Sequence, residues 1–163
     1  MNRPADTVVI GLGNVILSDD GLGVHAVRRL RERYALGAEI ELVEGGTAGL
    51  LLLPYLQDAR RAILVDAIDT GSPPGTLTRL NGEDWTNCST LMTPHDVALE
   101  DLLAAARLTV TWPEELALLG AQPAWLTLGT SLSPPVGAAL DPLVDAIVAQ
   151  LSAWTVVMGE PCA

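Results

Sequence analysis

Residues 7–34 indicate the fold most directly, and they read TVVIGLGNVILSDDGLGVHAVRRLRERY. The first five of them, residues 7–11, form a short apolar run of the kind found in buried strands. Residues 19–34 have the character of a helix, with acids at the start and arginines towards the end, an order that complements the helix macrodipole. A strand that passes through a glycine-containing turn into a helix is the first unit expected of an α/β sheet.

The remainder of the chain continues this alternation of strands and helices. The pattern predicts further strands at residues 39–43, 62–65, 76–80 and 115–122, and helices at residues 48–57, 93–106 and 136–154. We therefore expect a single α/β domain over residues 1–163, built on a mostly parallel sheet of about five strands that helices cover on both faces. Its core is expected at about residues 7–154, with a dispensable tail at residues 155–163.

The composition predicts one aliphatic core and an acidic surface. The chain has 163 residues, of which 49% are hydrophobic and none is Phe, a length that can bury one sizeable core but is short for two ordinary domains. Lys and Arg together number 9 against 20 Asp and Glu, so the formal net charge is −11. Such a surface repels phosphate backbones and anionic headgroups, which argues against nucleic acid and membrane partners.

Three features predict a cytoplasmic protein. The longest apolar stretches, such as residues 48–53 and 62–65, are far shorter than the roughly 20 residues of a membrane span. The N-terminus enters its first strand without the apolar region and cleavage site of a signal peptide. Cys88 and Cys162 form neither a disulfide framework nor a metal-finger spacing, so we expect two free, non-catalytic thiols in a reducing compartment.

Three polar residues are expected at one edge of the sheet. Ligands of open α/β sheets bind beyond the carboxyl ends of the strands. Asp20 opens the helix after the first strand, Asp66 ends the third strand, and His95 lies in the first turn of the helix begun by Thr93 and Pro94. The positive end of a helix keeps imidazole neutral, the form that binds metal. Two carboxylates and an imidazole suit zinc, nickel or a similar divalent ion.

Each of these residues also has an ordinary structural interpretation. Asp20 alone is more typical of a charge that complements its helix, and an Asp at the end of a strand commonly forms a turn. His95 is equally compatible with packing, capping or metal ligation. The second histidine, His25, lies inside the first predicted helix, where we expect a surface or packing role. It is the shared sheet edge that favours a functional site.

Other chemistries fit the sequence less well. Gly11 and Gly13 follow a strand as in a dinucleotide-binding fold, but Ile16 stands where the third glycine is needed. The same segment has no Walker lysine, and the chain contains neither a G-x-S-x-G nor an H-E-x-x-H motif. A small-molecule α/β enzyme of the purine phosphorylase type is disfavoured because its basic phosphate-binding residues are missing.

Four segments, taken in order along the chain, resemble motifs of the hydrogenase maturation proteases. They are GLGNVILSDDGLG at 11–23, EGGTAG at 44–49, LVDAIDTGSPPGT at 64–76 and TPHD at 93–96. One such motif alone is weak evidence, whereas four in register are strong evidence, and the likeness covers roughly residues 8–152. The resemblance implies a three-layer αβα sandwich with a mostly parallel, twisted central sheet.

The resemblance also implies a function. Members of this family remove a short C-terminal extension from the large subunit of a nickel-iron hydrogenase after nickel has been inserted. Their metal-contacting residues correspond to Asp20, Asp66 and His95 here, with Asp20 the catalytic candidate. The metal is the nickel of the substrate, so no intrinsic cofactor is expected, although zinc or cadmium can occupy such a site in vitro. The implied partner is the large-subunit precursor, and the protein is expected to be a monomer.

The cleavage chemistry stays open at this stage. Nickel held between the two proteins can polarise the scissile carbonyl while Asp20 or Asp66 activates water, or the carboxylates can act with the metal serving only for docking. Gly45, Gly46 and Thr47 are candidates for lining the peptide groove. The alternative function is a non-catalytic nickel-binding docking module or chaperone for hydrogenase assembly.

Overall fold

A computed structural model of the chain describes residues 5–81, 84, 97–108, 112–154 and 158–161. Its centre is a five-stranded sheet in the order β3-β1-β4-β6-β5. The strands are β1 (Thr7–Leu12), β3 (Ile40–Gly46), β4 (Arg61–Ala67), β5 (Leu77–Asn81) and β6 (Glu115–Ala121). All neighbouring pairs are parallel except β5 and β6, which are antiparallel. The expected mostly parallel α/β sheet is confirmed.

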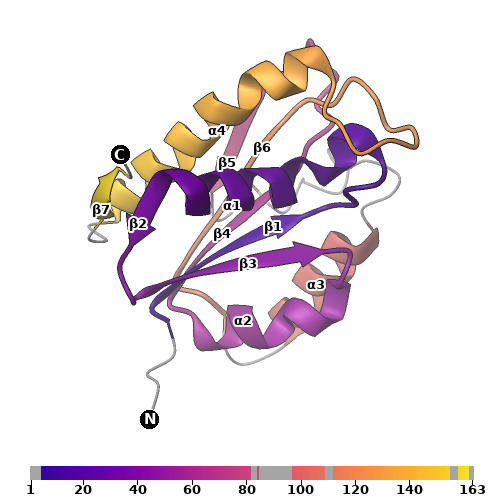
Figure 1. The fold of residues 1–163 in the computed structure, drawn as a ribbon. Helices are drawn as coiled ribbons and strands as arrows, with labels where there is room; N and C mark the ends of the chain where they lie inside the picture. The colour runs from indigo at the N-terminus through magenta and orange to yellow at the C-terminus, as the bar shows by residue number, and fades with distance from the viewer. Residues whose placement is uncertain (1–4, 82–83, 85–96, 109–111, 155–157, 162–163) are drawn as a thin grey trace.

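Helices cover both faces of the sheet and complete three layers (Figure 1). One face carries α1 (Leu22–Arg33) and α4 (Pro134–Ala153). The other carries η2 (Gly49–Leu52), α2 (Leu53–Asp58) and α3 (Val97–Leu108). Side chains that alternate along each strand supply the two cores: in β1, Val9 packs with α1 and α4, whereas Val8 and Ile10 pack with α2 and α3.

Helix α1 lies unusually close to the sheet because two glycines face each other across the contact. A Cβ atom on Gly11 of β1 would overlap the carbonyl oxygen of Gly23 in α1. A Cβ on Gly23 would overlap the carbonyl oxygen of Val65 in β4. Because these two glycines lack side chains, the first turn of α1 can lie directly against the backbones of β1 and β4.

The start of α1 differs from the sequence expectation. Residues 18–21 form a separate 3₁₀ turn, η1 (Ser18–Gly21), and the α-helix begins only at Leu22. Tyr34, expected at the end of the helix, instead begins a short strand, β2 (Tyr34–Leu36). The physical reason for the early turn is tertiary, because the side chains of residues 18 and 19 bond to a distant loop described below.

The expected tail at residues 155–163 contains a strand. Residues Met158–Pro161 form β7, which pairs antiparallel with β2 in a separate two-stranded sheet (Figure 1). The pairing lies beside the last turns of α1 and α4, at the opposite end of these helices from η1. Part of this tail is therefore tied to the body of the domain.

Helix α4 is long and apolar enough to cross a membrane by length and composition. Its apolar residues have another explanation, because Val136, Leu143, Val144, Ile147 and Leu151 are all buried in the core between the helix and the sheet. The helix is thus the second half of the layer formed with α1 (Figure 1).

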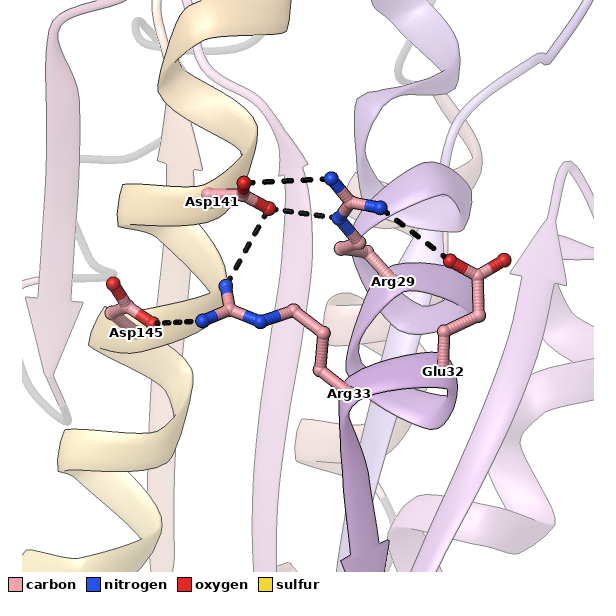
Figure 2. Close-up of polar contacts among 5 residues, drawn as sticks. All are labelled: Arg29, Glu32, Arg33, Asp141 and Asp145. Atoms are coloured by element: carbon pink, nitrogen blue, oxygen red, sulfur yellow. Dashed lines mark hydrogen bonds and ion pairs between the residues drawn. The ribbon is translucent and has the colours of Figure 1, made fainter. Parts of the chain in front are cut away.

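An exposed ion-pair network joins α1 to α4 (Figure 2). The Nε atom of Arg29 donates to Oδ1 of Asp141 at 2.8 Å, and Arg33 reaches Asp141 at 3.5 Å and Asp145 at 3.4 Å. Arg29 also lies 3.7 Å from Glu32 on its own helix. The pKa of Asp141 is lowered, chiefly by its hydrogen bond with Arg29.

This network should make a small, acid-sensitive contribution to stability. Because the pKa of Asp141 is lower in the folded state, its contribution is present above the unfolded pKa of about 4 and is lost as the pH falls through the folded pKa. Asp141→Asn should therefore lose less stability than the wild type between pH 5 and pH 3, measured by urea unfolding at both values. Glu41→Gln, at an exposed acid on β3, serves as the control, and equal losses in wild type and Asp141→Asn would contradict the assignment.

Candidate active site

The topology places a crevice at the carboxyl ends of β1 and β4. The connection after β1 leads to β3 on one side of it, whereas the chain after β4 continues to β6 and β5 on the other side. Loops that leave neighbouring strands in opposite directions open a crevice between them, and ligands of open α/β sheets bind there. Asp20 and Asp66, two of the three residues predicted from sequence, lie on the segments that border this crevice.

Asp66 is the penultimate residue of β4 and is 1% exposed. Its Oδ1 atom accepts a hydrogen bond from the backbone N–H of Ala67 at 2.8 Å. The carboxylate is thus held at the very end of a buried parallel strand, as the sequence predicted. The rigid sheet fixes its backbone on both sides, through β1 and β6.

Asp20 lies in η1 and is 3% exposed. Its Oδ2 atom accepts a hydrogen bond from the backbone N–H of Asn14 at 2.8 Å. Its Oδ1 atom is buried and has no hydrogen-bond partner among the described residues. Neither η1 nor α1 has a side-chain cap, and Asp20 lies in the first turn of η1, where its charge also fits the ordinary role of complementing the helix dipole.

Gly13 lies against the backbone of Asp20 and the carboxylate of Asp66. Its φ of 100° is a left-handed conformation that glycine adopts without strain. A Cβ atom there would overlap the carbonyl oxygen of Asp20 and would lie 3.3 Å from Oδ1 of Asp66. Its N–H donates to the carbonyl of Gly46 at 3.0 Å, which also ties the turn to the end of β3. A side chain at position 13 would therefore displace the backbone of Asp20 and crowd the carboxylate of Asp66.

His95 lies outside the described residues, as do Cys88 and Cys162. Within the described parts of the chain no group of three His, Cys, Asp or Glu residues is placed to hold a metal ion. The joint site of Asp20, Asp66 and His95 therefore remains a prediction. The other histidine, His25, is half-buried in α1, and its pKa is lowered first by burial and then by the charge of Arg28, consistent with the expected packing role.

Asp19 is a residue whose role the sequence did not reveal. It is completely buried, and its carboxylate accepts four hydrogen bonds from the loop between β6 and α4. The donors are the N–H groups of Ala124 at 2.8 Å, Trp125 at 2.9 Å and Ser133 at 2.7 Å, and the hydroxyl of Ser133 at 2.7 Å. A buried carboxylate satisfied in this way is a structural clamp.

Ser18 extends the same clamp. Its backbone N–H donates to the carbonyl of Gly129 at 2.8 Å, and its hydroxyl donates to the carbonyl of Thr127 at 2.9 Å. It has a φ of 50°, an uncommon left-handed conformation for a residue with a side chain, which the two bonds maintain. The turn that carries Asp20 is thus fixed to a loop more than 100 residues away in sequence.

The side chain of Gln122 likewise holds the loop after β4 in place through hydrogen bonds. Its Nε2 atom donates to Oδ1 of Asp69 at 3.0 Å, and its Oε1 atom accepts from the N–H of Thr70 at 2.7 Å. The hydrogen bond from Gln122, followed by that from Gly71, lowers the pKa of Asp69. The loops that follow β4 and β6 are therefore held together beside the crevice.

Comparison with known proteins gives one consistent result. A family model described as hydrogenase maturation protease matches residues 24–150. The chain is 38% identical over 155 residues to the hydrogenase expression/formation protein HupD of Rhodobacter capsulatus, covering 93% of this chain and 74% of that protein. It is 36% identical to the hydrogenase 2 maturation protease of Escherichia coli (strain K12), covering 88% and 89%. The solved structure of the hydrogenase maturating endopeptidase HybD from E. coli has a TM-score of 0.87 at 34% identity, covering 95% and 96%.

The contrast between Asp19 and Asp20 predicts losses of stability of very different size for the same substitution. Asp19→Asn should lower the free energy of unfolding by about 3 kcal/mol, because an amide group cannot accept from all four donors of the clamp. Asp20→Asn should cost less than about 1 kcal/mol, since the amide oxygen can still accept from Asn14 and the other buried oxygen loses no partner. Urea unfolding of the two variants tests this, and a larger loss in Asp20→Asn would contradict it.

Proposed function

The chain belongs to the hydrogenase maturation protease family, and on this premise we propose that it removes the C-terminal extension of a nickel-iron hydrogenase large-subunit precursor after nickel insertion. Family membership makes it a hydrolase that acts on proteins in hydrogenase maturation. The precise bond, the recognition of nickel and the place of the reaction, for which we propose the cytoplasm, are the parts that the proposal adds.

The observation that carries the proposal is the state of Asp20. Burying a carboxylate oxygen without a hydrogen-bond partner costs free energy, and such a cost is common where a group is kept for function. Asn14 holds Oδ2 in place, and Oδ1 has no hydrogen-bond partner among the described residues. A positioned carboxylate with a free oxygen can accept a proton or bind a cation.

We propose that Oδ1 of Asp20 is the general base. Asp20 accepts a proton from a water molecule, the water oxygen attacks the carbonyl carbon of the scissile bond, and the proton is then delivered to the leaving nitrogen as the carbon–nitrogen bond breaks. Asp66, next to Gly13, would hold the substrate beside Asp20.

The nickel belongs to the precursor, and its recognition is proposed to require Asp20, Asp66 and His95. Two carboxylates and a neutral imidazole leave positions open on a divalent ion, so an ion already bound by the precursor can complete its coordination with them. Docking would then occur only after nickel insertion. The proposal assigns no resident cofactor to this protein, which we propose acts as a monomer.

The test is release of the C-terminal peptide from purified precursor, measured by mass spectrometry. The wild type should cleave nickel-loaded precursor and leave nickel-free precursor intact. Asp20→Asn and His95→Ala should each lower the cleavage rate by about 100-fold or more. Asp58→Asn, at an exposed acid at the end of α2, is the control and should cleave normally.

Two outcomes would contradict the proposal in different ways. Equal cleavage of loaded and nickel-free precursor would refute recognition of nickel. Tight binding of loaded precursor without any peptide release by the wild type would refute the protease and favour the docking module or chaperone.

A further inference from the structure

A pocket of about 190 Å³ is lined in part by Gly13 and Asn14, which contact Asp66 and Asp20 respectively. It lies between the turn after β1 and the end of β3, and its lining includes Gly13, Asn14, Arg28, Glu44 and Thr47. Two of these residues belong to the site described above: Gly13 lies against Asp66, and the N–H of Asn14 holds Asp20. A group bound in this pocket would therefore lie close to the segment that holds Asp20.

The charged residues that line the pocket are Arg28 and Glu44, and Arg31 reaches the same carboxylate from outside the lining. Nε of Arg28 donates to Oε2 of Glu44 at 2.9 Å, and Nη1 of Arg31 donates to Oε1 at 2.6 Å. These bonds, that of Arg31 first, lower the pKa of Glu44, so this carboxylate stays ionised at neutral pH. Two guanidinium groups thus share one carboxylate.

Arg28 carries the uncommitted donors. Arg31 uses its second terminal nitrogen on the carbonyl of Leu42 at 3.4 Å. By contrast, in the described parts of the chain Arg28 bonds only through Nε, and its two terminal nitrogens have no recorded partner. Its side chain is 48% exposed, so these nitrogens remain open to an incoming group. Glu44 meanwhile restrains the guanidinium at the pocket.

We propose that Arg28 and this pocket bind a carboxylate group of the precursor, close to the peptide bond that is cleaved. The proposal rests on the proposed function and adds a specificity site to it. A guanidinium pairs with a carboxylate through two parallel N–H···O bonds, a geometry that a fixed arginine with free terminal nitrogens offers. The carboxylate is either an acidic side chain of the C-terminal extension or the terminal carboxylate of the extension. Thr47 adds a hydroxyl to the same wall.

The experiment uses the full chain with nickel-loaded precursor and compares Arg28→Gln with Arg29→Gln. Arg29 is the matched control, since it has the same charge on the same helix but pairs with Asp141 of α4 (Figure 2). Arg28→Gln should raise the dissociation constant of the precursor and the KM about tenfold, with a smaller change in kcat. Arg28→Lys should lie between this variant and the wild type, because it keeps the charge but loses the fork. Arg29→Gln should change both constants less than twofold.

Two altered precursors identify the source of the carboxylate. In one, the acidic residues of the extension are replaced by amides; in the other, three added glycines displace the terminal carboxylate. The change that removes the bound group should weaken binding to the wild type about tenfold and leave binding to Arg28→Gln unaffected, as expected for two partners of one interaction. If neither change weakens binding, or if Arg28→Gln binds like the wild type, the inference is overturned.

These results separate the inference from the proposed function. Peptide release with binding that does not depend on Arg28 would refute the carboxylate site alone. Binding that depends on Arg28 without peptide release would refute the protease alone. Thermal unfolding of Arg28→Gln close to that of the wild type is expected, because Glu44 keeps its bond to Arg31.

Discussion

The arrangement of this domain depends on the buried carboxylate of Asp19. Removing a carboxylate from water is costly, and here four donors from the loop before α4 offset that cost. The same four bonds fix the loop against η1 and the start of α1. The turn after β1 is therefore part of the protein's rigid framework rather than a free connection, and its geometry is set by residues from the C-terminal half of the chain.

Two adjacent aspartates divide structure and function between them. Asp19 is fully satisfied and inflexibly placed, whereas Asp20 keeps one buried oxygen without a partner among the described residues. Because Asp19 fixes the turn, Asp20 stays buried; a carboxylate oxygen without a hydrogen-bond partner would otherwise turn towards solvent. The close approach at Gly13 adds to this, since it brings the turn down to Asp66 and the sheet. The free-energy cost of the unpartnered Asp20 oxygen is offset by the hydrogen bonds of Asp19 around it.

The local sequence pattern was enough to predict the sheet and the positions of Asp20 and Asp66 in the candidate site. The apolar runs at β1, β4 and β6 mark buried strands, and the end of each strand shows where its loop must emerge, which placed Asp20 and Asp66 at the crevice. The pattern could not show that residues 18–21 leave the helix, or that Asp19 is a clamp, because its partners at 124, 125 and 133 are distant in sequence. Strands β2 and β7 were missed for the same reason, since each is short and is defined only by the other. The position of His95 lies outside the described residues and stays a prediction.

The pairing of β2 with β7 has a consequence for the order of assembly during synthesis. Residues 34–36 leave the ribosome early, yet their partner strand at 158–161 is made more than 100 residues later. Strand β2 therefore has no partner strand until residues 158–161 have been made. Closure of this small sheet consequently requires residues 34–161 to have been synthesised.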